Sequence, residues 1–168
     1  MTQEQSSQPK TYNLVGDRPQ AIVIHCSDPR FQQAFREFIH EELKLADGEY
    51  IPFVIAGGVG SLSEPLKLPK EYKFVRDRID LFVDRFGSID RMILINHEDC
   101  RQYEAFEQLI GKLFLNRVSG MVERQKIDLA KVSEALAGIV GRRLKFESYF
   151  AKFTGDGSKK VTFERVAG

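Results

Sequence analysis

Short apolar runs alternate along the chain with longer segments in which apolar residues recur every three or four positions. The apolar runs cover 21–24, 51–55 and 92–95 and are rich in isoleucine and valine. Continuous runs of this length are typical of strands buried on both faces of a sheet. Pro52 fits this interpretation less well, because proline has no amide hydrogen to donate to a neighbouring strand.

Four other segments have helical spacing, with apolar residues on one face and charged residues between them. They cover 31–43, 74–86, 103–113 and 129–139. Strands and helices that alternate in this way indicate βαβ units and a parallel sheet covered on both sides. Near the C-terminus, the segments 144–153 and 161–166 flank the sequence Thr-Gly-Asp-Gly-Ser and are typical of a hairpin.

Together these patterns predict an α/β fold. The expected architecture is a mainly parallel central sheet of four strands plus one antiparallel edge strand, with helices on both faces. The length of 168 residues suits one folded domain. Residues 1–18, rich in Gln, Ser and Thr, are expected to form a polar N-terminal arm, and residues 19–168 the folded domain.

Charge and composition exclude several classes of protein. The chain has 25 basic and 24 acidic residues, so it lacks the electrostatic signature of nucleic-acid or anionic-membrane binding. Its longest apolar runs fall far short of the roughly 20 residues that span a bilayer. The polar start 1–10 has no apolar segment of the kind found in secretory signals. We therefore expect a cytoplasmic protein whose cysteines stay reduced.

The chemistry-bearing residues gather at the ends of three predicted strands. The segments that follow these strands are 25–30 (His-Cys-Ser-Asp-Pro-Arg), 56–61 (Ala-Gly-Gly-Val-Gly-Ser) and 96–100 (Asn-His-Glu-Asp-Cys). In open α/β sheets, ligands bind beyond the carboxyl ends of the strands. Cys26 and Cys100, the only cysteines of the chain, are therefore expected at the same edge of the sheet.

Cys26, His97 and Cys100 form a candidate zinc site. A free cysteine by itself often packs as a small apolar side chain, and a single His-x-x-Cys is a weak metal signal. Together, two thiolates and an imidazole are ligands that zinc prefers, and three protein ligands leave a fourth position for water or substrate. His25 is expected on the opposite face of its strand and His40 in a helix, so neither is assigned a ligand role.

Asp28 and Arg30 are candidate catalytic residues beside that site. Both follow Cys26 at two-residue spacing, so their side chains can turn toward the same side. The Arg30 guanidinium can hold the Asp28 carboxylate by a bidentate pair and keep it ionised, so that the carboxylate accepts a hydrogen bond from zinc-bound hydroxide. The alternative is a solvated ion pair, with Asp28 capping the start of a helix.

Two phosphate-binding motifs fail at the same strand ends. A phosphatase loop needs an arginine six residues after the cysteine, but position 32 is Gln. A dinucleotide fingerprint needs a glycine at position 63, which is Ser, and the Gly-Lys-Ser/Thr of a phosphate loop is absent. The glycines within 57–60 are therefore interpreted as allowing close backbone approach beside the site.

The strand-end motifs resemble those of a known family. The segment 26–31 (Cys-Ser-Asp-Pro-Arg-Phe) resembles the Cys-x-Asp-x-Arg signature of the β-class carbonic anhydrases, and 97–100 resembles their His-x-x-Cys. Ala-Gly-Gly at 56–58 and the strands around Thr-Gly at 154–155 are similar to the family's Ala-Gly segment and last hairpin. The resemblance runs from about residue 18 to the C-terminus. Asn96 and Arg101 stand where the family usually has glycine, and Val-Ile at 54–55 replaces its Arg-Asn.

The resemblance implies a cofactor and an activity. Zn²⁺ would be bound by Cys26, His97 and Cys100, and Asp28 with Arg30 would orient a zinc-bound hydroxide. That hydroxide would attack carbon dioxide and release bicarbonate, which makes the chain a zinc lyase acting on a small molecule. Two alternatives remain. One is hydrolysis of carbon disulfide or carbonyl sulfide at a similar site, and the other is zinc binding without turnover.

A homodimer or larger homo-oligomer is also expected. The chain has 13 phenylalanines and no tryptophan, and the helices at 31–43 and 74–86 carry more aromatic bulk than a five-stranded sheet is expected to cover. The excess suggests an apolar surface shared with a second subunit, as the dimers of the resembled family imply. The alternative is that all of these side chains fill the core of one chain.

Overall fold

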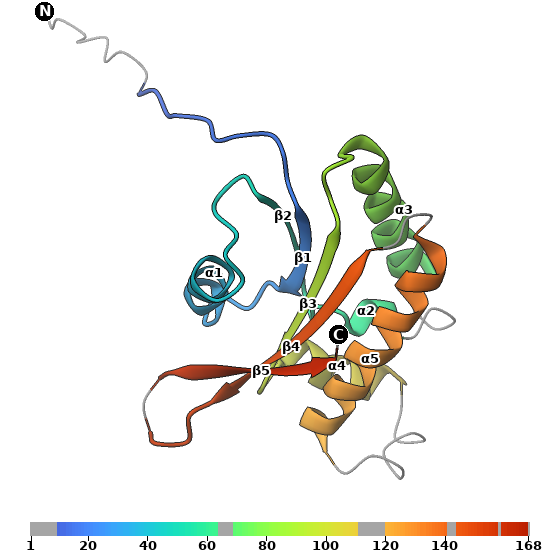
Figure 1. The fold of residues 1–168 in the computed structure, drawn as a ribbon. Coiled ribbons are helices and arrows are strands. Elements are labelled where there is room, and N and C mark those ends of the chain that lie inside the picture. The colour runs from blue at the N-terminus through green and yellow to red at the C-terminus, as the bar shows by residue number, and fades with distance from the viewer. Residues whose placement is uncertain (1–9, 64–68, 111–119, 141–143, 158, 168) are drawn as a thin grey trace, which may run out of the picture.

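The apolar runs become three neighbouring strands of one sheet. The computed structural model describes residues 10–63, 69–110, 120–140, 144–157 and 159–167. Its strands are β1 (Ala21–Cys26), β2 (Tyr50–Ile55), β3 (Arg91–His97), β4 (Lys145–Phe153) and β5 (Val161–Ala167), in the order β2-β1-β3-β4-β5. Every neighbouring pair is parallel except β4 and β5. The predicted sheet of four parallel strands with one antiparallel edge strand is therefore confirmed (Figure 1).

Helices cover both faces of this sheet. On one face lies α1 (Gln32–Glu41), and on the other lie α2 (Gly60–Ser63), α3 (Pro69–Arg85), α4 (Arg101–Ile110) and α5 (Met121–Ile139), as Figure 1 shows. The short α2 is not predicted by the spacing of apolar residues. α3 and α5 also begin earlier than that spacing indicates, because their first turns carry few buried apolar side chains. Leu113, the last residue of the third predicted helix pattern, lies outside the described residues.

The sheet separates two layers of core, and β1 contacts both. All six residues of β1 are buried. Ile22 and Ile24 pack on the side of α3 and α5, whereas Ala21 and Val23 pack on the side of α1. A strand whose two faces both pack against helices needs apolar residues at every position, which explains the unbroken apolar run.

β2 differs from the expectation that it is buried on both faces. It is the edge strand of the sheet, and its side chains alternate between half-buried and exposed. Pro52 is exposed, and Val54 keeps 45% of its surface accessible. Proline is tolerated at a sheet edge because its missing amide hydrogen leaves no neighbouring strand unpaired.

Most of the phenylalanines pack within the chain, so the aromatic excess is smaller than the sequence suggests. Phe31 and Phe35 are buried, and Phe38 stacks on Phe163 with ring centroids 4.0 Å apart. Phe82 and Phe86 pack against the core on the side of α3 and α5. Phe74 alone of the six predicted on the two helices is more than half exposed, at 55%.

The register of the sheet brings the ends of three strands together. Cys26 at the end of β1 lies beside Ile55 at the end of β2, and β3 runs parallel to β1 on its other side. The segments that follow β1, β2 and β3 therefore leave the same edge of the sheet. Residues 10–18 of the N-terminal arm are exposed along their length. None of the helices in the described part of the chain is both long and apolar enough to cross a membrane.

Candidate metal centre

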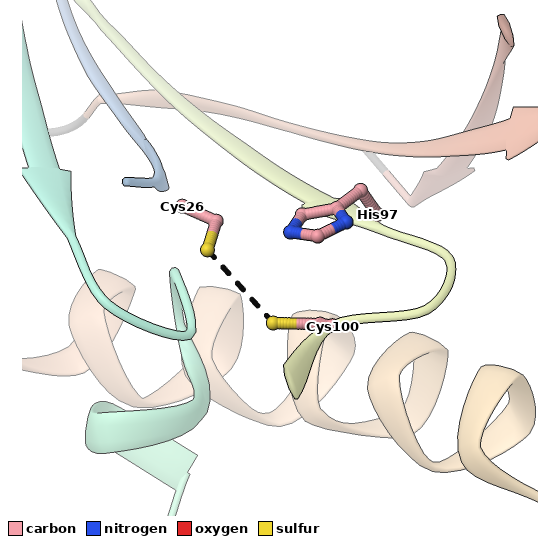
Figure 2. Close-up of side chains that lie close together, drawn as sticks. All are labelled: Cys26, His97 and Cys100. Atoms are coloured by element: carbon pink, nitrogen blue, oxygen red, sulfur yellow. Dashed lines mark hydrogen bonds between the residues drawn. The ribbon is translucent and has the colours of Figure 1, made fainter. Parts of the chain in front are cut away.

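Three buried side chains converge at this edge of the sheet. Cys26 is the last residue of β1, His97 is the last residue of β3, and Cys100 directly precedes α4. Their ligand atoms all lie within 4.8 Å of one another. Figure 2 shows the two sulfur atoms and the imidazole ring turned toward a common space. The structure thus brings together the three residues that the sequence places in a candidate zinc site.

The spacing of the two sulfur atoms matches the geometry of one tetrahedral metal ion. The Sγ atoms of Cys26 and Cys100 are 3.8 Å apart, the contact drawn as a dashed line in Figure 2. Two sulfur ligands, each about 2.3 Å from a tetrahedral zinc ion, are about 3.8 Å from each other. A zinc ion therefore fits between these side chains without a change in their separation.

His97 is held in the tautomer that a metal ligand requires. Its Nδ1 lies 2.8 Å from the backbone carbonyl oxygen of Glu98, and because a carbonyl oxygen only accepts, Nδ1 carries the hydrogen. Nε2 then has a free lone pair. The side chain is completely buried, and Nε2 has no hydrogen-bond partner among the described residues. A buried nitrogen of this kind costs free energy unless something binds it.

The two thiols influence each other's protonation. Hydrogen bonding with Cys100 lowers the pKa of the Cys26 thiol to about 4, against the opposing effect of burial. The same hydrogen bond, together with burial, raises the pKa of Cys100. These opposite directions favour the thiolate at Cys26, and a soft cation bound between the two sulfur atoms would stabilise both residues as thiolates.

The loop after β2 approaches the sulfur atoms closely. The backbone N–H of Gly57 donates to the Sγ of Cys26 at 3.3 Å. Gly58 has a φ of +54°, and a Cβ atom built on it would lie 2.5 Å from the Oδ1 of Asn96. At Gly57 and Gly58 the backbone therefore approaches the site closely, as the sequence predicts, and a side chain at Gly58 would force the Asn96 side chain to move.

Asp28 and Arg30 form a tight pair on the loop after β1. The Nε of Arg30 donates to both carboxylate oxygens of Asp28, and its Nη2 donates to Oδ2 at 2.7 Å. The side-chain hydrogen bonds from Arg30 lower the pKa of Asp28, so the carboxyl is held in its ionised form. Asp28 does not cap α1, whose N-cap residue is Phe31, without a side-chain cap.

Asp99 holds Arg30 from its other side, and the sequence gives little sign of this role. The Nη1 of Arg30 donates to the Oδ2 of Asp99 at 2.7 Å, and Nη2 donates to the Asp99 backbone carbonyl at 2.8 Å. Asp99 has a φ of +56°, which turns the chain between His97 and Cys100. One guanidinium therefore links the loop after β1 to the loop after β3.

A cavity of about 340 Å³ opens beside the cysteines. Its walls come from the loops after β1 and β2 and from the start of α4, and they comprise Cys26, Ser27, Asp28, Pro29, Arg30, Ala56, Cys100, Arg101 and Gln102. The sulfur atoms and the Asp28–Arg30 pair thus face one solvent-connected space. A small molecule in this cavity contacts both sets of residues.

Solved structures with the same arrangement of strands and helices have been described. No protein-family model and no curated protein sequence matches this chain. A carbonic anhydrase from Streptococcus mutans is similar with a TM-score of 0.56 at 10% identity, over 94% of this chain and 88% of that chain. Tetrameric β-carbonic anhydrases from Sordaria macrospora give a TM-score of 0.55 at 14% identity, over 88% and 81%. A carbon disulfide hydrolase in its apo form gives 0.50 at 13% identity, over 82% and 76%.

The chain has the fold of the β-carbonic anhydrases. At 10–14% identity the likeness concerns the fold, and it confirms the fold that the sequence resemblance implies. Within this β-carbonic anhydrase fold, the Cys-His-Cys cluster can hold a metal ion.

The two positions that depart from the family's glycines have different surroundings. Asn96 is buried, accepts a hydrogen bond from the Val59 backbone and donates to the hydroxyl of Tyr103 at 3.1 Å. It ties β3 to the loop after β2 and to α4. Arg101 is instead exposed on the cavity wall.

Gln32 is a site residue that the sequence does not identify. In the sequence it serves only to exclude a phosphatase loop. In the structure its side-chain amide donates to the backbone carbonyls of Cys26 and Asp28, at 2.9 and 2.7 Å. These two bonds fix the loop that carries Cys26 and Asp28. The sequence does not predict these two hydrogen bonds. Every residue has a backbone carbonyl group, so the residue types at the acceptor positions give no indication of them.

The other two histidines lie away from the cluster, as expected. His25 is buried on the opposite face of β1, where its ring lies 4.9 Å from that of Phe35. Burial lowers the pKa of His25. His40 lies on α1, with its Nε2 3.2 Å from a carboxylate oxygen of Asp47.

Proposed function

We propose that this chain is a zinc enzyme that hydrates carbon dioxide to bicarbonate. The observation that carries the proposal is the Cys26–His97–Cys100 cluster, whose sulfur atoms are 3.8 Å apart, on the wall of the same cavity as the Asp28–Arg30 pair. The β-carbonic anhydrase fold supports it, because related folds carry carbonic anhydrase activity in Streptococcus mutans and Sordaria macrospora.

In this proposal Cys26, His97 and Cys100 hold the zinc ion. Two thiolates and one neutral imidazole satisfy zinc, and the cavity beside them leaves the fourth position accessible. Zinc, when bound there, supplies Lewis-acid chemistry that lowers the pKa of a water molecule toward neutrality. The hydrogen bond from His97 to the Glu98 carbonyl keeps Nε2 turned toward the metal position.

Asp28 orients the attacking water molecule. A carboxylate offers about four lone-pair positions, and Arg30 uses those on one side of Asp28. The remaining positions accept a hydrogen bond from water, which directs the lone pair of the water oxygen toward carbon dioxide. Arg30 also prevents Asp28 from binding the metal itself, since a carboxylate released from its ion pair competes for the open position.

We also propose that the chain acts as a homodimer or larger homo-oligomer in the cytoplasm, with residues 19–168 forming the catalytic domain. The Sordaria macrospora enzymes of similar fold are tetrameric. In this chain Val54 on β2 and Phe74 and Leu81 on α3 remain 45–55% exposed, which leaves apolar surface for a second subunit.

The proposed function is tested by measuring metal content and carbon dioxide hydration on the same preparation. We expect close to one zinc per chain and hydration well above the uncatalysed rate. We also expect the rate to rise with pH, with a midpoint above ~7, because two thiolates neutralise the metal charge. Zinc without hydration would contradict the enzymatic proposal. Release of hydrogen sulfide from carbon disulfide or carbonyl sulfide, without hydration of carbon dioxide, would show that the substrate is one of these sulfur compounds. The proposed metal site would then stand.

A further inference from the structure

Among the described residues that line the cavity, Arg101 is the charged residue that lies outside the proposed metal site and its Asp28–Arg30 pair. It is the first residue of α4, directly after Cys100, and its side chain is exposed on the cavity wall. A cation at the first position of a helix is electrostatically unfavourable, because the helix dipole is positive at that end. The acidic Glu104 in the same first turn offsets part of this cost.

The two arginines of the cavity differ in what they bind. Arg30 is fully engaged, with hydrogen bonds to the carboxylates of Asp28 and Asp99 and to a backbone carbonyl. The side chain of Arg101 has no ion-pair or hydrogen-bond partner among the described residues. Its guanidinium is therefore available to a ligand that enters the cavity.

The charged residues that line the cavity favour the binding of one anion. Asp28 and Arg30 offset each other, and Arg101 adds one positive charge. Two thiolates offset a divalent metal ion, so the metal site adds nothing. The lining therefore carries a net charge of +1 with Arg101 and is neutral without it. A guanidinium also binds planar oxyanions through two parallel N–H donors, which suits the shape of a carboxylate or carbonate group.

We propose that Arg101 is the anion-binding residue of this cavity and that its ligand is a small planar oxyanion, bicarbonate in the proposed reaction. This inference rests on the proposed function for the choice of bicarbonate, and on the geometry of the cavity for the anion site itself. The side chain extends from the residue next to Cys100, so an oxyanion on its guanidinium lies in the same cavity as the sulfur atoms. Arg101 thus retains bicarbonate beside the position where it is formed or consumed.

The test measures anion affinity rather than activity. Isothermal titration of the zinc-loaded full chain with bicarbonate, and separately with nitrate as an unreactive planar anion, gives the dissociation constants. Arg101→Gln removes the charge and should raise both constants roughly tenfold, the usual effect of losing a charge-assisted hydrogen bond at a partly exposed site. Arg101→Lys keeps the charge without the planar fork and should give intermediate values. Zinc content should remain that of the wild type in both variants.

Arg85→Gln is the matched control. Arg85 is the last residue of α3 and lies shortly before the start of β3, at the opposite edge of the sheet from the cavity. The Arg85→Gln variant removes the same charge from the molecule. Unchanged dissociation constants in this variant would show that weaker binding in Arg101→Gln comes from a local contact and not from net charge.

The outcomes distinguish this inference from the proposed function. If Arg101→Gln binds both anions as tightly as the wild type while the wild type hydrates carbon dioxide, the inference is wrong and the proposed function stands. If both anions bind through Arg101 but hydration is absent, the proposed function fails and the anion site stands. Tighter anion binding in Arg101→Gln would show that Arg101 obstructs the cavity, and undetectable binding to the wild type would also overturn the inference.

Discussion

His97 has one ring nitrogen committed to a backbone carbonyl and the other buried without a partner. The packing of Phe31, whose ring centroid lies 4.0 Å from that of His97, keeps the imidazole in this orientation. Contacts with the protein's own residues therefore hold the imidazole in its orientation at the cluster. Holding a ligand in this way reduces the ordering of side chains that metal binding requires.

Arg30→Ala separates metal binding from catalysis. The substitution releases Asp28 from its bidentate pair and from the link to Asp99. We expect zinc content to remain near that of the wild type and the hydration rate to fall roughly 10–100-fold, a typical effect of removing a residue that orients a metal site. The measurement is metal analysis beside stopped-flow hydration kinetics. Arg36→Ala is the control, because Arg36 forms a similar pair with Asp47 on the exposed side of α1. Unchanged hydration in Arg30→Ala would refute the role of the pair.

Gly58→Ala tests the close approach beside the cysteines. The added Cβ would meet the Oδ1 of Asn96 at 2.5 Å, and the residue would have to keep a φ of +54°. We expect the free energy of unfolding to fall by roughly 1–3 kcal/mol. Gly138→Ala is the matched control: Gly138 lies in α5 with open space around it, so alanine there should stabilise by about 0.5–1 kcal/mol. Equal denaturation midpoints for the two variants would contradict the packing described for Gly58.

At the level of elements, β3 supplies residues to both ends of the sheet. Its last residue is His97, and its first residue, Arg91, donates to the carboxylate of Glu147 on β4 at 2.8 Å and to the Leu43 carbonyl at 3.2 Å. Glu147 is 4% exposed. This buried pair joins β3, β4 and the segment after α1. It lies at the start of β3, whereas the metal centre lies at the end of that strand.

Arg91→Gln is expected to destabilise the fold without changing the site. Loss of Arg91 leaves the buried Glu147 carboxylate with the Tyr149 hydroxyl and the more distant, exposed Lys145 as its remaining partners, and removing the close partner of a buried ion pair typically costs about 3 kcal/mol. Urea denaturation at pH 7 measures this loss. Lys145→Gln is the control: Lys145 lies 3.7 Å from the same carboxylate but is 67% exposed, so its removal should cost about 0.5 kcal/mol or less.

The destabilisation by Arg91→Gln should depend on pH. Burial raises the pKa of Glu147, but hydrogen bonds from Arg91 and Tyr149 and the charge of Arg91 outweigh it, so the pKa lies below its ordinary value of 4.5. A carboxyl with a lowered pKa stabilises the fold above its ordinary pKa and loses that contribution as pH falls through the native pKa. The stability difference between wild type and variant should therefore be complete at pH 7 and shrink as pH falls through and below the ordinary pKa of 4.5. A difference independent of pH would contradict the role of the pair.

The elements show where sequence patterns are informative. β1 and β3 are predicted because strands covered on both faces require unbroken apolar runs. β2 shows a similar run but lies at the edge, and Pro52 is the residue that indicates this position. The start of α5 is missed because its buried positions there are Gln125 and Asp128, which apolar spacing does not detect.

Cys26, His97 and Cys100 are predictable because strand order places their segments together. The contacts of Gln32 and Asp99 depend on backbone direction, which no residue pattern encodes.

For the whole molecule, the exposed apolar side chains suggest an interface. Phe74 and Leu81 lie seven positions apart on α3, a spacing that places both on one face of the helix, and both are about half exposed. Tyr12, Leu14 and Val15 of the N-terminal arm are also exposed, at 63–97%. A single chain leaves these apolar groups in water, and a second subunit would cover them.

Sedimentation velocity of the full chain tests the homo-oligomer. We expect a mass of at least two chains at micromolar concentration. The mass should persist at high salt, because burial of apolar surface is not screened as charge contacts are. A monomer at assay concentration would reject the interface and show that the exposed apolar side chains remain in solvent.

The zinc site is tested most directly by X-ray absorption at the zinc edge, measured on the purified full chain with metal content determined in parallel. We predict close to one zinc per chain, with two sulfur ligands at about 2.3 Å and nitrogen or oxygen ligands at about 2.0 Å. Cys26→Ser and His97→Ala should each lose stoichiometric zinc. A spectrum without sulfur ligands, or full zinc occupancy in either variant, would contradict the assignment of Cys26, His97 and Cys100 as the metal ligands.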